Sequence, residues 1–94
     1  MKYIVVKDLA GMESIYLFSS TIKHSDMACK VCGERMSAGT IVSAGSIMYD
    51  EDNGACTCLG ESLTLKVKSR GEPDNILLRA TLRTMYVSIH SRLG

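Results

Sequence analysis

Residues 3–18, YIVVKDLAGMESIYLF, decide the fold of this chain. Residues 3–7 are rich in β-branched side chains and predict a strand, and residues 14–18 predict a second strand. Residues 8–12 between them, DLAGM, have the composition of a turn. The two strands are therefore expected to pair as an antiparallel hairpin.

The next segments predict a helix and a second hairpin. Apolar residues recur at helical spacing over residues 25–36, where Ser25 is the expected N-cap. Residues 40–49 favour a strand in which Gly45 marks a bulge or a close approach of two backbones. Residues 50–54, DEDNG, predict a turn, after which residues 55–59 should pair back.

The last third shows three further patterns. Residues 63–67 alternate between apolar and polar side chains, which predicts a half-buried strand. Pro73, followed by Asp74 and Asn75, signals a helix start, so residues 76–83 are expected to form one or two helical turns. Residues 84–90 return to alternation and predict a final strand.

These elements indicate an α+β fold, with a small antiparallel β-sheet of five or six strands and one or two short helices. The chain has 94 residues, which corresponds to a single domain over residues 1–94. Hydrophobic residues make up 46% and charged residues 22%, a balance that excludes general disorder. The sequence has no apolar run of membrane-spanning length and its first residues do not resemble a signal peptide. We therefore expect a cytoplasmic protein with no membrane contact.

Charge is distributed unevenly along the chain. The formal net charge is +1, which argues against a DNA or RNA polymer as partner. Residues 1–60 hold five basic and seven acidic side chains, whereas residues 61–94 hold six basic and three acidic ones. The basic last third can neutralise a few phosphates, although solvated surface charge is the simpler interpretation of each single cation.

Four cysteines raise the question of a metal site. Cys29 and Cys32 form a CxxC pair and Cys56 and Cys58 a CxC pair, and four thiolates can hold a structural zinc ion. The first pair, however, falls in the expected helix, and the second has the wrong spacing for a zinc knuckle. Free cysteines also pack as small hydrophobic residues. We therefore expect no metal, no other cofactor and no disulfide.

No catalytic constellation is apparent. The two histidines, His24 and His90, have no sequence-placed partner, and no phosphate-binding loop or nucleophile motif is present. We therefore expect a protein that is not an enzyme.

A phosphate site is the remaining candidate. Lys66 and Lys68 lie on one face of the expected strand and lead into Arg70, which precedes a helix start. Backbone N–H groups at a helix N-terminus beside a guanidinium suit a phosphate, provided that the neighbouring acidic residues cap backbone or contact ribose hydroxyls. Arg79 and Arg83 would share one helix face. A turn with solvent-facing cations is the alternative.

The sequence resembles one family. The order KYIVVKD, IYLFSSTIKHSDMA, TIVSAGSI and CLGESLTLKVKSRGEPDNILL is similar to that of small phage proteins of the first Thoeris anti-defence family. The resemblance covers about residues 2–78, and the chain departs from the pattern at Gly71. It implies a sponge that sequesters cyclic ADP-ribose isomers, and possibly cyclic oligonucleotides, in the host cytoplasm during infection. It also implies a homodimer or homohexamer.

The resemblance assigns roles to individual residues. Residues 49–53 and 70–76 would cover the ligand, with Arg70 at the pyrophosphate and Asn53 at the ribose or base. Thr21, Lys23 and His24 would face a second site. A base would stack on Phe18, Tyr16, Tyr49 or Tyr86, or on an arginine. The expected ligand-binding set is Phe18, Tyr49, Asn53, Ser62, Lys68, Arg70, Asp74, Asn75 and Arg79.

Two other function classes stay open. The cysteine pairs would suit a small zinc-stabilised adaptor. A surface without a nucleotide site would suit a protein-binding inhibitor of a host defence enzyme. Zinc in the purified protein would indicate the adaptor. A rise in melting temperature with a nucleotide ligand would indicate the sponge, and the inhibitor would show neither.

Overall fold

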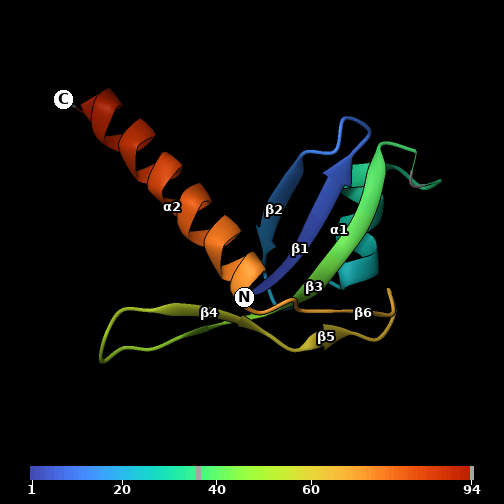
Figure 1. The fold of residues 1–94 in the computed structure, drawn as a ribbon, viewed down its shortest axis with the longest axis horizontal. Helices are drawn as coiled ribbons and strands as arrows, with labels where there is room; N and C mark the ends of the chain where they lie inside the picture. Colours follow the sequence, from blue (N-terminus) through green and yellow to red (C-terminus); the bar gives the residue numbers. More distant parts are fainter. Residues whose placement is uncertain (36, 94) are drawn as a thin grey trace.

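The computed structural model describes residues 1–35 and 37–93, which form two sheets and two helices (Figure 1). In chain order the elements are β1 (Lys2–Asp8), β2 (Glu13–Phe18), α1 (His24–Cys32), β3 (Gly39–Tyr49), β4 (Cys56–Leu59), β5 (Glu61–Ser62), β6 (Val67–Lys68) and α2 (Glu72–Leu93). The first four strands form an antiparallel sheet in the order β2-β1-β3-β4, and β5 pairs with β6 alone. The α+β class is confirmed, but the strands are divided between two sheets rather than joined in one.

The first hairpin has the expected form. β1 pairs with β2 over its length, from Lys2 opposite Phe18 to Lys7 opposite Glu13. The turn is held by Asp8, whose carboxylate accepts hydrogen bonds from the N–H groups of Ala10 and Met12, both at 2.9 Å. β1 also pairs with β3, so its apolar run lies at the centre of the sheet.

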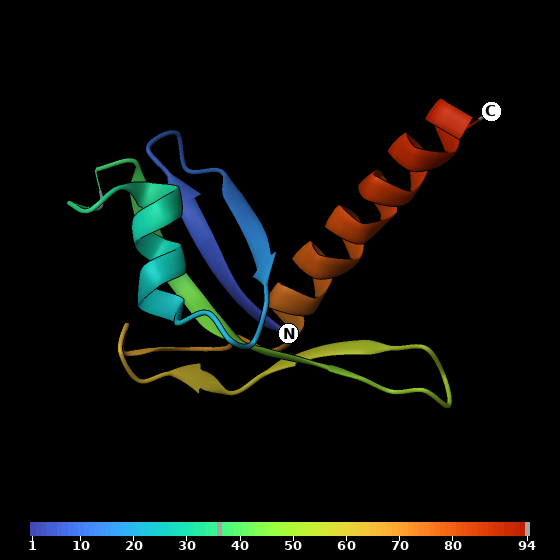
Figure 2. The same ribbon diagram turned by 180° about the vertical axis from the view of Figure 1, so that it is seen from behind.

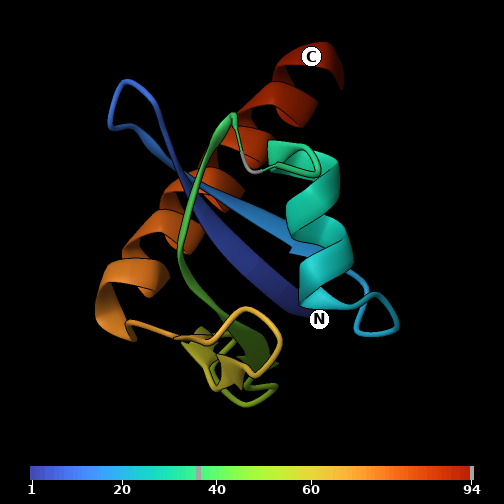
Figure 3. The same cartoon turned by 90° about the vertical axis from the view of Figure 1, so that its right-hand side faces the viewer.

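Each helix covers one face of this sheet, as Figure 3 shows. On one face Ile4 and Val6 of β1 pack with Ala28 and Cys32 of α1. On the other face the alternate β1 residues pack with Leu78 of α2. Because successive side chains of a strand point to opposite faces, the uninterrupted apolar run of β1 serves both layers.

Helix α1 begins one residue earlier than expected and ends earlier. Its N-cap residue is Lys23, with no side-chain cap, so Ser25 is not the cap. After Cys32 the chain turns through Gly33, whose φ of 81° favours glycine, and the N–H of Gly33 bonds to the Cys29 carbonyl at 2.8 Å. The expected extension to residue 36 reaches beyond this stop.

The second hairpin is confirmed, with Tyr49 opposite Cys56. Gly45 marks a close approach: a Cβ at this position would lie 2.3 Å from the Leu59 carbonyl oxygen. The bulge lies nearby, where β1 shifts register between Val5 and Val6 and Val42 is the additional residue of β3.

The predicted strand over residues 63–67 is wrong. Residues 63–66 form the turn between β5 and β6, in which Leu63 is 80% exposed and Lys66 has a φ of 56°. The hydroxyl of Ser62 accepts a hydrogen bond from the N–H of Leu65 at 3.2 Å. This local bond gives the backbone an alternative to a sheet partner and closes the turn.

The predicted final strand over residues 84–90 is also wrong, because α2 runs continuously to Leu93. The helix has 22 residues, about 33 Å at 1.5 Å per residue, and residues 74–93 contain no glycine or proline to end it. Figures 1 and 2 show that only its first turns lie against the body of the protein. The helix therefore projects away from the sheet.

We expect Gly45→Ala to destabilise the protein by about 3 kcal/mol, because the added Cβ would press on backbone rather than on a movable side chain. Gly54→Ala is the matched control. Gly54 has a φ of 71° and open space around it, so alanine there carries only conformational strain of about 1 kcal/mol. Urea unfolding of both variants measures the difference, and equal losses would contradict the close approach.

Candidate functional site

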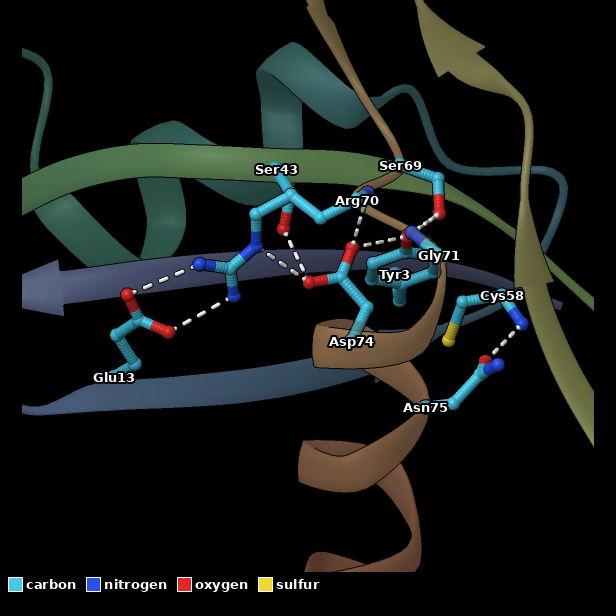
Figure 4. Close-up of polar contacts among 9 residues, drawn as sticks. All are labelled: Tyr3, Glu13, Ser43, Cys58, Ser69, Arg70, Gly71, Asp74 and Asn75. Atoms are coloured by element: carbon cyan, nitrogen blue, oxygen red, sulfur yellow. Dashed lines mark hydrogen bonds and ion pairs between the residues drawn. The ribbon is translucent and has the colours of Figure 1, made fainter.

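The strongest concentration of polar contacts surrounds the first turn of α2 (Figure 4). Pro73 lies in this turn, where its missing N–H removes no helical hydrogen bond. Asp74 follows and is completely buried. A buried carboxylate requires hydrogen-bond donors on both oxygens, since a bare charge in the interior is very unfavourable.

The carboxylate of Asp74 accepts four hydrogen bonds. Its Oδ1 accepts from the Ser43 hydroxyl at 2.9 Å and from Arg70 Nε at 2.8 Å. Its Oδ2 accepts from the Tyr3 hydroxyl at 2.7 Å and from the backbone N–H of Arg70 at 2.9 Å. Burial alone would raise the pKa of Asp74, but these hydrogen bonds together lower it below its usual value.

Arg70 joins this carboxylate to strand β2. Its two terminal nitrogens donate to the Glu13 carboxylate, Nη1 at 3.1 Å and Nη2 at 2.9 Å. The hydrogen bond from Arg70 lowers the pKa of Glu13, and the two acidic partners raise that of Arg70. Three of the five guanidinium N–H groups are thus occupied.

Tyr3 links the cluster to the loop before α2. Its hydroxyl lies 2.7 Å from Asp74 Oδ2 and 2.6 Å from Ser69 Oγ. Since an ionised carboxylate can only accept, the Tyr3 proton goes to Asp74 and the Ser69 hydroxyl donates to the Tyr3 oxygen. Burial raises the pKa of Tyr3, so this proton stays in place. We call these residues the Asp74 cluster: Tyr3, Glu13, Ser43, Ser69, Arg70 and Asp74.

The charge of the Asp74 cluster bears on phosphate binding. It holds one cation, Arg70, and two carboxylates, Glu13 and Asp74. The net charge of the cluster is negative and repels an anion. A phosphate that approached Arg70 would be opposed by Glu13 and Asp74. Asp74 accepts a hydrogen bond from the backbone N–H of Arg70, which is one of the two roles expected of an acidic residue here. The cluster as a whole holds the start of α2 to the sheet.

A second group of expected residues lies where α2 and the β3–β4 hairpin leave their common junction. Asn75 Oδ1 accepts a hydrogen bond from the Cys58 N–H at 2.7 Å and marks this junction. Arg79 lies one helical turn, about 6 Å, further along α2. Cys56 lies two residues, about 7 Å, further toward the tip of the hairpin. Arg79 on α2 and Cys56 on the hairpin therefore lie at similar distances from the junction.

Tyr49 shares the face of the hairpin that is turned to α2. Two cross-strand pairs lie on this face, Ile47 opposite Cys58 and Tyr49 opposite Cys56. Ile47 and both cysteines pack in the core cluster that contains Leu78. Tyr49 does not belong to that cluster and is 61% exposed. An aromatic ring is therefore presented to solvent on the α2 side of the hairpin.

Arg79 is held by an exposed ion pair. Its Nη2 lies 2.6 Å from Glu72 Oε1, with both side chains more than half exposed. Arg79 lowers the pKa of Glu72 through this bond. Exposed pairs of this kind contribute little to stability, so Arg79 can exchange Glu72 for another anion at small cost.

The other expected residues are dispersed. Asn53 caps the hairpin turn by accepting from the Ala55 N–H at 2.8 Å, and Lys68 is exposed opposite Glu61. Ser62 is buried in the β5–β6 turn. Thr21 and Lys23 are exposed in the segment before α1.

Phe18 and His24 lie in the core, which corrects their expected place at ligand-facing surfaces. Their rings make an edge-to-face contact with centroids 5.5 Å apart, and each residue is less than 9% exposed. His24 Nε2 also lies 2.9 Å from the Gly45 carbonyl oxygen. Neither ring can meet a ligand without leaving this packing. Of the other aromatic candidates, the Tyr86 side chain lies outside the described residues.

The cysteine pairs are separated by the sheet. Cys32 packs under α1, whereas Cys58 packs under α2 on the opposite face. Burial raises the pKa of both thiols, that of Cys58 to about 11, so both are neutral hydrophobic groups. Within the described part of the chain no three histidine, cysteine or acidic side chains are grouped to hold a metal ion.

Sequence reasoning missed four members of the Asp74 cluster, namely Tyr3, Glu13, Ser43 and Ser69. Ser43 is a small polar residue inside an apolar strand, and Tyr3 places a hydroxyl group in an apolar run. Both patterns indicate a buried polar partner. Which partner they meet depends on the pairing of β1 with β3, which brings Tyr3 and Ser43 onto one face of the sheet.

Comparisons with models of known families, with curated proteins and with solved structures give no match. None of the helices within the described ranges has the length and apolar character needed to cross a membrane.

We expect Asp74→Asn to destabilise the protein by about 3 kcal/mol at pH 7, because the amide NH₂ would face two donors. The folded-state pKa of Asp74 is lowered, so its contribution is complete above the unfolded pKa of about 4 and is lost as the pH falls below it. The difference between wild type and variant should therefore shrink below pH 4.

Urea unfolding at pH 7, 5 and 3 measures this difference. Asp52→Asn, on the exposed hairpin turn, is the control and should leave the free energy of unfolding unchanged. A difference between wild type and Asp74→Asn that persists at low pH would contradict the ionised Asp74.

Proposed function

We propose that the protein binds and sequesters a cyclic nucleotide signal without cleaving it, in the cytoplasm of an infected host cell. The resemblance to the first Thoeris anti-defence family supports this assignment. The observation that carries it in the structure is the exposed Tyr49 ring on the hairpin face turned to α2, with Arg79 following the same junction on the helix.

The two side chains supply what a nucleotide requires. A base stacks on an aromatic ring, and a guanidinium makes paired hydrogen bonds to a phosphate. Arg79 replaces Arg70 as the first phosphate contact, because Arg70 is already paired with two carboxylates and Arg79 only with the exposed Glu72. Asn75 and Asn53 act in the scaffold of this surface, because Asn75 bonds to Cys58 and Glu72 and Asn53 accepts from Ala55, which leaves the NH₂ group of Asn53 for ribose or base.

The projecting part of α2 supports self-association. Leu82, on the part of α2 that extends away from the sheet, is 39% exposed, so an apolar side chain is presented there. A long helix gains most of its stability from packing, which a second copy can supply. A second copy that covers this surface gives the homodimer or larger homo-oligomer of the proposal.

The cysteine arrangement does not favour a zinc-stabilised adaptor. Four thiolates on opposite faces of one sheet cannot reach a common tetrahedral ion. Chelator treatment of the purified protein therefore should not unfold it.

The decisive experiment uses a defined panel of cyclic ADP-ribose isomers, cyclic dinucleotides and cyclic trinucleotides. The protein is incubated with the panel, free ligand is removed, and bound ligand is released by heat and identified by mass spectrometry. Release of one member chemically intact is expected. Retention of none would overturn the proposal, and release of a linear product only would indicate an enzyme.

We expect Tyr49→Ala and Arg79→Ala each to weaken binding of the released ligand by about tenfold or more, through loss of stacking and of a charged hydrogen bond. Tyr16→Ala and Arg35→Ala are the matched controls, since both residues lie away from α2 and outside the proposed site. Calorimetry measures the affinities. Equal affinity in all four variants would place the ligand elsewhere.

We expect light scattering to report at least a dimer at micromolar concentration, and Leu82→Glu to shift the mass to that of a monomer with the fold retained. A charge at position 82 opposes the burial of this part of the helix. Thr64→Glu, on the exposed β5–β6 turn, is the control. A monomeric wild type would contradict the self-association.

A further inference from the structure

Asn53 and Asn75 are the two asparagines of the chain, and their surroundings differ. Asn53 precedes Gly54 in the exposed turn between β3 and β4, which Figures 1 and 2 show at the far end of the hairpin. Asn75 lies at the start of α2 and is followed by Ile76. Both residues carry the same amide group, so a difference in their reactivity must come from their positions.

The side-chain amide of an asparagine reacts with the backbone of its own chain, and asparagine is therefore among the thermolabile residues. The backbone nitrogen of the next residue attacks the side-chain carbon Cγ, the bond from Cγ to NH₂ breaks, and ammonia leaves with the proton of the attacking nitrogen. Water then opens the resulting cyclic imide at either carbonyl, which gives aspartate or isoaspartate. The net reaction converts an amide and water into a carboxylate and an ammonium ion, with no other reactant.

The turn presents Asn53 for this attack. The next residue is Gly54, which has no Cβ beside the attacking nitrogen, and a Cβ built there would meet no atom within 4 Å. The Asn53 side chain is folded toward the residues that follow it, since its Oδ1 accepts a hydrogen bond from the Ala55 N–H at 2.8 Å. Because Gly54 lies between these two residues, this bond holds Cγ close to the Gly54 nitrogen.

We propose that Asn53 is a site of spontaneous modification, at which attack by the Gly54 nitrogen converts the amide into a carboxylate. One hydrogen bond opposes the reaction, because the Gly54 N–H donates to the Asp50 carbonyl oxygen at 2.8 Å and must be released first. This bond lies in an exposed turn, where backbone hydrogen bonds open locally without unfolding of the whole domain. The attacking nitrogen therefore becomes available in the folded protein.

Asn75 is protected from the same reaction and serves as the internal control. Its Oδ1 accepts from the Cys58 N–H at 2.7 Å and its Nδ2 donates to Glu72 at 3.2 Å, so the amide is held at both ends. The nitrogen of Ile76 lies within α2, where each N–H donates to the carbonyl four residues earlier. The β-branched side chain of Ile76 also crowds this nitrogen.

The modification bears on nucleotide binding, and this consequence rests on the proposed function. Residues 50–52 are all acidic, and conversion of Asn53 adds another negative charge to the turn that follows Tyr49. Conversion also removes the NH₂ group that Asn53 keeps for ribose or base. The added charge repels a ligand that carries phosphate groups, so the converted protein binds it more weakly.

Mass spectrometry of the ligand-free protein tests the modification itself. The folded full chain is kept in a mildly alkaline buffer prepared with water enriched in heavy oxygen, and its peptides are mapped at intervals. Heavy oxygen is expected to enter the side chain of residue 53 and not that of residue 75. A synthetic peptide of residues 48–55, treated in parallel, gives the rate for the same sequence without the folded turn.

The comparison with the peptide decides the result. Residue 53 of the folded protein should react within about tenfold of the rate in the peptide, because only local opening is needed. Reaction of the peptide with none at residue 53 of the protein would overturn the proposal, and so would equal labelling of both asparagines.

Gly54→Ala tests the route of the reaction. The added methyl group hinders the attacking nitrogen, so labelling of residue 53 should slow by about tenfold or more. Gly71→Ala is the matched control, because Gly71 also has a φ of 71° and no atom within 4 Å of a built Cβ. It should leave the rate at residue 53 unchanged. Equal rates in the two variants would contradict attack by the Gly54 nitrogen.

Asn53→Asp tests the consequence for binding. By calorimetry it should bind the ligand released from the nucleotide panel severalfold more weakly than wild type at low salt, and the difference should shrink at high salt. Thr64→Asp, on the exposed β5–β6 turn, adds the same charge elsewhere and should have no effect. Equal affinity of wild type and Asn53→Asp would overturn the link to the nucleotide site. A panel that yields no ligand would overturn the proposed function alone, because the labelling is measured without ligand.

Discussion

The buried carboxylate of Asp74 is the constraint on which the arrangement of this protein depends. A charge without solvent must be surrounded by donors, and these come from three segments: Tyr3 of β1, Ser43 of β3 and Arg70 before α2. All three must be in place together, so the first turn of α2 is fixed on the sheet in position and direction. The projection of the rest of the helix follows from this single attachment.

The same attachment determines where binding surfaces can form. α2 and the β3–β4 hairpin leave one junction in different directions, and so do the first half of β3 and the β5–β6 hairpin. The divergence of α2 from the β3–β4 hairpin leaves Tyr49 exposed and Arg79 in an exposed ion pair with Glu72. The proposed nucleotide surface, with an aromatic ring on the hairpin and a guanidinium on the helix, would depend on this divergence.

Local structure was predictable from the sequence where local interactions decide it. The β1–β2 hairpin, the turn before β4 and the close approach at Gly45 all follow from short patterns. Residues 63–67 were misjudged because the bond from Leu65 to Ser62 outweighs their alternation, and residues 84–90 because an anchored helix continues until a breaker stops it. The role of Arg70 could not be deduced, because Glu13 and Arg70 are 57 positions apart and meet only when the start of α2 docks on the sheet.

The Asp74 cluster also has a consequence for how the chain folds during synthesis. Tyr3 and Asp74 are 71 positions apart, so strand β1 waits for its hydrogen-bond acceptor until residue 74 has been made. Such long-range contacts slow folding, because distant segments must meet before any interaction compensates for their lost freedom. A nascent chain that ends before residue 74 holds the β1–β2 hairpin and α1 but leaves one face of the sheet uncovered. Completion of the protein is therefore a late, cooperative step in which the last helix closes over the first strand.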